Sequence, residues 1–296
     1  HIEEAGIHSG DSSCVIPPWS IGEETTRRLS EITRAVALDL NVVGLINVQF
    51  AVHNDAIYVI EVNPRGSRTI PFASKAVGRP LARIATRVMV GKKLADMGLT
   101  TPPAPTHVSV KKAVLPFERF PGEDTLLGPE MKSTGEVMGI GEDFGRAYAK
   151  AQLGSGEGLP LTGTVFLSIR DADKRSIVFL SKKLLELGFR IVATGGTARF
   201  LKMNGQIVES VNKIIEPAPN VMDWIVSGRI HMVINTPEGG PSQHDDQAIR
   251  MAAVARGIPV ITTIPGAMAA VSGIESIRSS GMTVAPIQAL APVLEA

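Results

Sequence analysis

Short apolar segments alternate with amphipathic helical segments throughout Leu161–Ala296, and this alternation leaves few folds open to the chain. Parallel strands need long crossover connections, which an intervening helix supplies. The pattern therefore predicts a doubly wound parallel sheet, an α/β fold. Strands are expected at Val165–Ile169, Phe189–Ala193, Met232–Ile234 and Pro259–Thr262, and helices at Ile177–Leu187, Ala198–Met203, Val221–Val226, Asp245–Ala255 and Ala267–Ile277.

Three of these strands end in small polar residues. Ligands on open α/β sheets bind at the carboxyl ends of strands, where this chain has Thr194-Gly195-Gly196-Thr197, Asn235-Thr236-Pro237 and Thr262-Thr263. The first run opens onto a helix, whose backbone N–H groups suit a phosphate. Lys174 and Lys213 are expected to add positive charge. The other interpretation is that Gly195-Gly196 is only a tight turn between strand and helix.

The first part of the chain, to about Thr101, has a different pattern that predicts an α+β unit. An amphipathic helix is expected at Glu23–Leu40, and two strands at Val42–Val52 and Ile57–Val62 are joined by a short turn. A second helix is expected at Leu81–Leu94. The run Pro102-Pro103-Ala104-Pro105 then marks a boundary.

A mixed segment connects these two parts. We expect a strand at Val108–Leu115, turns over Pro116–Gly141, a helix at Phe144–Leu153 and a linker at Gly154–Gly158. The chain is thus predicted to have domains at residues 1–101 and 159–296, joined by a connecting segment at 102–158.

The expected hairpin of the first part carries oxygen ligands. Side chains alternate along a strand, so Glu61 and Asn63 share a face, as do Asn47 and Gln49. A two-residue turn at Asn54-Asp55 would place Gln49 opposite Ile60, whereas a three-residue loop or an equivalent bulge would place it opposite Glu61. In the second case a carboxylate and amide oxygens converge, a set that suits Mg²⁺.

Two arginines follow this hairpin directly, Arg65 and Arg68, and guanidinium groups complement phosphoryl or carboxylate oxygens. The sequence therefore predicts a metal–phosphate site at the end of the hairpin. The other interpretation is an edge hairpin whose polar face is solvated.

Composition excludes several classes of protein. The 30 basic and 29 acidic side chains give a net charge of +1, without the basic bias of a nucleic-acid-binding surface. No apolar run reaches the roughly 18–20 residues of a membrane span. The single cysteine, Cys14, excludes an intramolecular disulfide framework and fits a cytoplasmic location. Because the chain opens at His1 in a polar run, we expect it to be a fragment of a longer protein.

Several long runs resemble the carboxy-terminal half of the large subunit of carbamoyl-phosphate synthetase. The motif Glu61-Val62-Asn63-Pro64-Arg65 alone would indicate an ATP-grasp ligase. The match is carried by His1-Ile2-Glu3, His8-Ser9-Gly10-Asp11-Ser12, Asn47-Val48-Gln49-Phe50-Ala51-Val52, Ile60-Glu61-Val62-Asn63-Pro64-Arg65, and Leu127-Gly128-Pro129-Glu130-Met131-Lys132-Ser133-Thr134-Gly135-Glu136-Val137-Met138-Gly139. The resemblance implies the carboxy-terminal lobe of an ATP-grasp domain followed by a methylglyoxal-synthase-like allosteric domain.

The resemblance assigns roles in the phosphorylation of carbamate by ATP, which forms carbamoyl phosphate. It makes Gln49, Glu61 and Asn63 ligands of Mg²⁺ (or Mn²⁺), with Gln49 and Glu61 also in the ATP site. It places Arg65 and Arg68 on carbamate and the transferring phosphoryl group. The nucleotide site is lined by Gly6, Ile7, His8 and Ser9. The implied partners are a glutaminase small subunit and the rest of the large subunit, in an oligomer that serves arginine or pyrimidine synthesis.

The last domain resembles a regulatory domain that binds nucleotides such as UMP. The residues implied to hold the phosphate and ribose are Ser168, Lys174, Thr194, Thr197, Lys213, Asn235 and Thr236. Pro237 and Gly240 stand where enterobacterial members have a threonine and an arginine, which leaves the effector's identity open. A site for an ornithine-type activator would match at Glu3, Asp11 and Thr262 but meets Lys112 and Val260 instead of an acidic and an aromatic residue.

Two other functions are open. The chain could be a stand-alone nucleotide-binding regulatory module without catalysis, or its last domain could be a lyase that releases phosphate from dihydroxyacetone phosphate. Asp245-Asp246 are candidate carboxylates for that lyase, but alone they fit a helix N-terminus better. In the synthetase family the ATP-covering lobe precedes the residue that matches His1. The isolated chain is therefore expected to bind an effector and to be inactive by itself.

Overall fold

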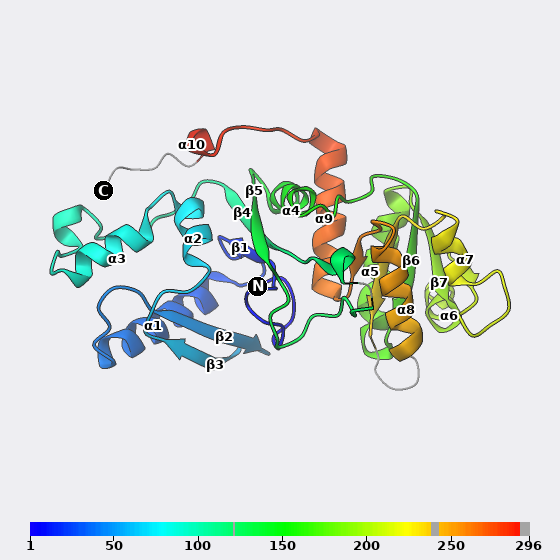
Figure 1. Ribbon diagram of the computed structural model, residues 1–296, viewed down its shortest axis with the longest axis horizontal. Coiled ribbons are helices and arrows are strands. Elements are labelled where there is room, and N and C mark those ends of the chain that lie inside the picture. The colour runs from blue at the N-terminus through cyan, green and yellow to red at the C-terminus, as the bar shows by residue number, and fades with distance from the viewer. Residues whose placement is uncertain (121, 238–242, 291–296) are drawn as a thin grey trace. The chain divides into compact units, whose positions relative to one another are not determined.

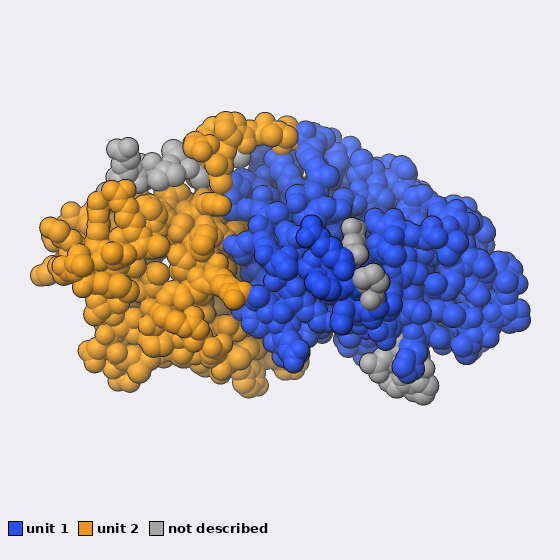
Figure 2. Space-filling model, viewed as in Figure 1, with its two compact units in different colours: residues 1–14, 110–282 blue, residues 15–109, 283–296 orange. Residues whose placement is uncertain are grey.

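The computed structural model describes residues 1–120, 122–237 and 243–290, so Gly240 lies outside the described part. Two compact units make up the chain (Figures 1 and 2). Unit 1 comprises His1–Cys14 and Val110–Met282, and unit 2 comprises Val15–Ser109 and Thr283–Ala296. Residues 1–14 and 110–158 thus belong to the same unit as the last domain. The domains expected from the sequence, 1–101 and 159–296, were placed by sequence motifs, and their boundaries remain a prediction.

Unit 1 contains the parallel sheet that the sequence predicts. Its order is β10-β9-β6-β7-β8, and each neighbouring pair is parallel. From β6 the chain moves first to one side and then to the other, which confirms the doubly wound topology. The strands are β6 (Thr164–Ile169), β7 (Arg190–Thr194), β8 (Glu209–Val211), β9 (Met232–Thr236) and β10 (Val260–Ile261).

Helices follow the strands in the expected alternation. They are α5 (Lys174–Glu186), α6 (Gly195–Met203), α7 (Val221–Val226), α8 (Gln243–Val254) and α9 (Ile264–Ser280), with a single turn of 3₁₀ helix, η3 (Asp171–Asp173), before α5. Asn220 caps α7, because its side chain accepts hydrogen bonds from the N–H groups of Met222 and Asp223. One face of the sheet packs against α7 and α8 through Phe166, Val192, Val233 and Trp224.

The connecting segment folds into a strand pair and a helix. β4 (Val108–Val114) and β5 (Gly135–Gly141) are neighbours in a sheet of order β1-β4-β5, where β1 is Cys14–Ile16. Helix α4 (Phe144–Gly154) packs on β5 and on α9. The prediction of turns over Pro116–Gly141 is wrong for β5. The glycines of this segment lie in a strand, where they let helix α4 pack closely against it. A Cβ at Gly139 would lie 2.1 Å from the backbone oxygen of Ala147.

Unit 2 contains the hairpin and its helices. The hairpin strands are β2 (Asn47–His53) and β3 (Ala56–Asn63), and the helices are α1 (Glu23–Asp39), α2 (Ile70–Val77), α3 (Leu81–Met89) and α10 (Ile287–Leu290). The expected helix Leu81–Leu94 ends at Met89, since Gly91 takes a φ of 94° and closes it. Further 3₁₀ turns are η1 (Ala95–Met97) in unit 2 and η2 (Phe117–Arg119) in unit 1. Within the described ranges, no helix is long and apolar enough to cross a membrane.

Candidate functional site

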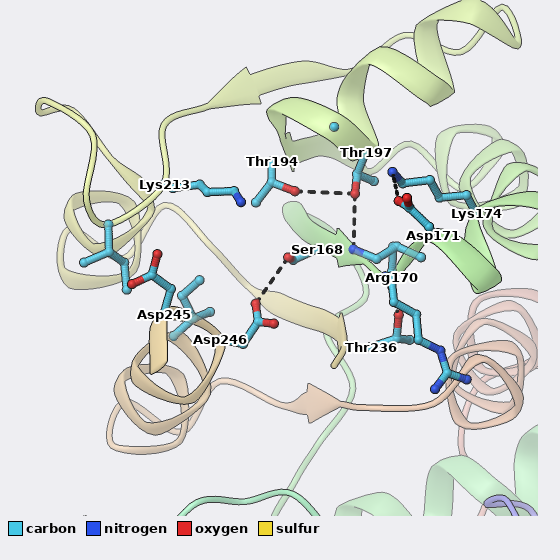
Figure 3. Close-up of a pocket in the computed structure, with 14 residues that line it drawn as sticks. Ser168, Arg170, Asp171, Lys174, Thr194, Thr197, Lys213, Thr236, Asp245 and Asp246 are labelled. Atoms are coloured by element: carbon cyan, nitrogen blue, oxygen red, sulfur yellow. Dashed lines mark hydrogen bonds and ion pairs between the residues drawn. The ribbon is translucent and has the colours of Figure 1, made fainter. Parts of the chain in front are cut away.

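A pocket of about 100 Å³ opens at the carboxyl ends of β6, β7 and β9 (Figure 3). This is where the strand order reverses, the usual position for a ligand on such a sheet. The residues that line it are Ser168, Ile169, Arg170, Asp171, Lys174, Thr194, Gly196, Thr197, Lys213, Ile214, Thr236, Asp245, Asp246 and Ile249. Six of the seven predicted effector contacts, all except Asn235, are in this set.

Threonine hydroxyls in the pocket are held in place by hydrogen bonds. The N–H of Ile169 donates to Thr197 Oγ1 over 3.2 Å, and Thr194 Oγ1 lies 3.4 Å from the same oxygen. The N–H of Arg170 donates to Thr236 Oγ1 over 3.0 Å. These contacts fix the hydroxyl oxygens before any ligand arrives, which lowers the entropic cost of binding one.

Helix α6 presents its N-terminus to the same pocket. Gly195 and Gly196 are its first two residues, so they belong to the helix itself and not to a preceding loop. The helix has no side-chain cap at Thr194. Its first N–H groups have no partners inside the helix, and together with the helix dipole they favour an anion.

Both signs of charge line the pocket. Lys174 is the first residue of α5 and forms an ion pair with Asp171, whose side chain is 77% exposed. Lys213 is the second lysine, and Figure 3 shows it reaching in from the segment after β8, with Asp246 on the opposite wall. Burial raises the pKa of Asp246, although hydrogen bonds from Asn235 and Ser168 oppose this rise.

Asn235 lies behind the pocket wall and is fully buried. Its amide nitrogen donates to Asp246 Oδ1 over 2.9 Å and to the Ser168 carbonyl over 3.4 Å, and its amide oxygen accepts from Arg250 Nη1 over 2.6 Å. All its polar atoms are therefore engaged within the protein. Sequence reasoning did not identify Arg250, a buried arginine that also pairs with Asp124, because nothing local to either residue indicates their contact.

The hairpin of unit 2 brings the predicted oxygen ligands together. Gln49 pairs with Glu61 and Asn47 with Asn63, so all four side chains lie on one face. The turn itself has two residues, Asn54 and Asp55, both at positive φ. A bulge between Gln49 and Phe50 shifts the register, which confirms the bulged alternative of the sequence analysis.

The donor set fits a hard cation such as Mg²⁺. Glu61 is exposed, and Asn63 Oδ1 accepts a hydrogen bond from Arg65 Nη2 over 3.3 Å. Among the described residues there is no cluster of three or more His, Cys, Asp or Glu side chains arranged for a metal. The predicted set has one carboxylate and two amides, which leaves coordination positions for water and phosphate oxygens. Arg65 and Arg68 follow in exposed positions.

The predicted nucleotide-lining loop, residues 6–9, lies in unit 1 and is tightly held there. The N–H of His8 donates to the Gly128 carbonyl over 2.8 Å, and His8 Nδ1 accepts from the N–H of Gly10 over 3.0 Å. Buried Lys111 donates to the carbonyls of Ser9 and Gly10 over 3.2 and 3.1 Å. Because the hairpin belongs to unit 2, a joint site of Gly6, Ile7, His8 and Ser9 with Glu61 remains a prediction.

A second cavity in unit 1, of about 520 Å³, includes most of the residues considered for a cationic activator. Glu3, Lys112, Val260 and Thr262 line it, whereas Asp11 does not. Lys112 Nζ lies 3.1 Å from Glu157. The lysine's charge is thus already paired within the protein.

Comparison with known families divides the chain into two parts. Residues 3–97 match the family described as carbamoyl-phosphate synthase L chain, ATP binding domain. Residues 176–262 match the family described as MGS-like domain. The first match covers the hairpin and the loop of His8, and the second covers most of the parallel sheet.

Similar proteins with the name carbamoyl phosphate synthase large chain match almost the whole chain. That of Archaeoglobus fulgidus is 54% identical and that of Synechocystis sp. is 52% identical, each over 97% of this chain and 27% of the relative. That of Methanosarcina barkeri is 51% identical over 94% of this chain and 70% of the relative. The chain thus spans about a quarter of the length of most of these relatives.

Proposed function

The chain belongs to the carbamoyl phosphate synthase large-chain family, and from that premise we propose that it supplies two parts of an intact ATP-dependent ligase. The pocket of unit 1 binds a nucleotide effector such as UMP. The hairpin of unit 2 holds the metal that serves the phosphorylation of carbamate by ATP. The whole enzyme's reaction is carried by a longer protein, since this chain covers 27% of relatives such as that of Archaeoglobus fulgidus.

The observation that supports an effector pocket is the convergence of anion-binding groups at one sheet edge. Thr194, Thr197 and Lys174 surround the N-terminus of α6, which suits a phosphate. Asp171 competes for Lys174, but its exposed side chain can turn into solvent when a phosphate arrives. On the opposite wall, Asp246 can accept hydrogen bonds from sugar or base donors.

Calorimetric titration of the chain with UMP, IMP and ATP tests this half of the proposal. We expect at least one of them to bind, and Lys174→Ala to weaken that binding roughly tenfold or more, as loss of a charge-assisted contact does. Lys182→Ala is the matched control, because Lys182 is on the same helix and its side chain is 65% exposed. Equal affinities for the two variants would contradict an effector site here.

The hairpin serves phosphoryl transfer by positioning. Gln49, Glu61 and Asn63 would hold Mg²⁺, which when bound neutralises charge on the ATP phosphates. Arg65 and Arg68 orient carbamate through its oxygens and stabilise charge that develops on the phosphoryl group. Carbamate is already an anionic nucleophile, so none of these side chains needs to remove a proton. The carbamate oxygen attacks the γ-phosphorus of ATP and ADP leaves.

Glu61→Gln in the full-length enzyme tests the catalytic half. The change removes the only carboxylate of the predicted ligand set, so we expect carbamoyl phosphate formation to fall at least about a hundredfold. Bicarbonate-dependent ATP hydrolysis, carried by the other half of the enzyme, should persist. Asp55→Asn, an exposed carboxylate in the turn of the same hairpin, should leave both activities unchanged. Near-normal synthesis by the Glu61→Gln enzyme would count against the assignment.

The same proposal includes the partners. The intact cytoplasmic enzyme would work with a glutaminase small subunit that supplies ammonia, and the isolated chain would bind effector without catalysis. The match of residues 3–97 to an ATP-binding domain favours this over a stand-alone regulatory module. Formation of methylglyoxal from dihydroxyacetone phosphate would instead support the lyase alternative.

A further inference from the structure

A line of buried and partly buried polar contacts within unit 1 leads away from the effector pocket. It starts at Asp246 on the pocket wall, which accepts from Asn235. Asn235 in turn accepts from Arg250, whose Nε and Nη2 donate to the two carboxylate oxygens of Asp124 over 2.8 and 2.5 Å. Asp124 belongs to the connecting segment, far from the sheet in sequence.

From Asp124 the line continues to the loop of His8. Lys132 Nζ donates to the carbonyls of Asp124 and Leu126 over 3.1 and 3.2 Å. The N–H groups of Lys132 and Ser133 donate to the buried carboxylate of Asp11 over 2.8 and 3.0 Å. Asp11 immediately follows the loop that contains His8, and the N–H of Asp11 donates to the His8 carbonyl.

Burial makes this connection stiff. The Arg250 side chain is 0% exposed, so water cannot replace a partner that moves away. A guanidinium in that setting must keep its hydrogen bonds or bear a large desolvation cost. Its planar fork joins Asn235 on one side to Asp124 on the other, and a shift of either partner is transmitted to the other.

We propose that Asn235, Arg250 and Asp124 couple occupancy of the effector pocket to the order of the loop of His8. The inference rests on the proposed function, because it takes the pocket as an effector site and the loop as part of the nucleotide site. A ligand that donates to Asp246 fixes the position of this carboxylate, which keeps the Asn235 amide on Arg250 and the Arg250 guanidinium on Asp124. Arg250 and Asp124 are positioning residues and contact neither ligand.

Amide hydrogen exchange at Lys132 and Ser133, measured by NMR on the whole chain, reports the far end of this line. We expect saturating UMP to slow exchange at both amides at least about fivefold, the lower limit of typical coupling between sites. The paired change Arg250→Met with Asp124→Leu breaks the line without leaving a buried unpaired charge. This variant should bind UMP but lose the slowing, whereas Glu123→Gln, a neighbouring exposed carboxylate, should retain it.

A ligand-free comparison separates this inference from the proposed function. Asp246→Asn should change exchange at Lys132 and Ser133 without any nucleotide. Asp245→Asn, which lines the same pocket but is not bonded to Asn235, should not. UMP binding with unchanged exchange at both amides would overturn the coupling while leaving the effector site intact. If no nucleotide binds, the proposal of an effector site is wrong. If Asp246→Asn then also leaves the exchange of Lys132 and Ser133 unchanged, the proposed coupling is wrong as well.

Discussion

Replacing Asp124 with asparagine should destabilise unit 1 far more than a typical carboxylate substitution. The change removes the negative charge that faces Arg250, whose side chain is 0% exposed, while the Asp124 side chain is 21% exposed. Both carboxylate oxygens are used, at 2.8 and 2.5 Å, and an amide can keep only one acceptor. The remaining guanidinium is then buried without the carboxylate that pairs with it directly.

Breaking one side of a buried ion pair costs about 3–5 kcal/mol. The partial exposure of Asp124 and the remaining contact of Arg250 with Asn235 place our expectation at the lower end, about 3 kcal/mol. With a urea m-value of roughly 2–3 kcal/mol/M, the unfolding midpoint should fall by about 1–1.5 M.

Urea unfolding followed by tryptophan fluorescence measures this loss in unit 1 alone. Of the two tryptophans, Trp224 is buried in the core of unit 1 and Trp19 belongs to unit 2, so the assay uses a Trp19→Phe background. Glu123→Gln is the matched control. A midpoint shift for Asp124→Asn no larger than that of the control would show that Arg250 does not depend on Asp124 for stability.

The loss of stability caused by Asp124→Asn should depend on pH, and the direction follows from the pKa of Asp124. Burial favours the neutral form of Asp124, but the hydrogen bonds and charge of Arg250 outweigh it and hold the pKa below its ordinary value. A carboxyl with a lowered folded-state pKa stabilises the protein above its unfolded pKa of about 3.9, and this contribution disappears as the pH falls through the folded value. The difference between the wild type and Asp124→Asn should therefore shrink below about pH 4.

Further variants test packing and surface charge by the same measurement of unfolding free energy. Gly145→Ala places a Cβ 2.3 Å from a backbone oxygen of α9 and should cost about 3 kcal/mol, whereas Gly154→Ala in the same helix meets only ordinary contacts beyond 3.4 Å and should cost less than about 1 kcal/mol. Burial raises the pKa of Asp246, so above about pH 4 the native state binds more protons than the unfolded state. Asp246 therefore lowers the free energy of unfolding as the pH rises from about 4, and Asp246→Asn should abolish this decline. Arg190→Ala breaks a pair with Glu209 whose side chains are 66% and 48% exposed, and should change stability by less than about 0.5 kcal/mol.

The elements that sequence reasoning found are those with a clear period. The helices at Glu23–Asp39 and Val221–Val226 follow from the amphipathic spacing of apolar residues, and both lie where expected. The strand Gly135–Gly141 was missed because its glycines are typical of turns, whereas here they admit helix α4. The three-residue strand β8 was too short to show an alternation.

In the candidate sites, too, local patterns could be predicted from the sequence and long-range contacts could not. The pairing of Gln49 with Glu61 followed from the oxygen ligands, but only the structure shows that a bulge, not a longer loop, produces it. Asn235 has the residue type of a ligand contact, yet its amide is used by Arg250 and Asp246. A contact such as that of Arg250 with Asp124 joins residues 126 positions apart, and no local pattern encodes it.

A crystal structure of the chain with UMP tests the effector pocket most directly. We expect the phosphate at the N-terminus of α6, within hydrogen-bonding distance of the Thr194 and Thr197 hydroxyls and of Lys174, with the nucleoside directed toward Asp246. Density for UMP in the cavity lined by Lys112 and Glu157, or a pocket left without nucleotide at saturating UMP, would contradict it.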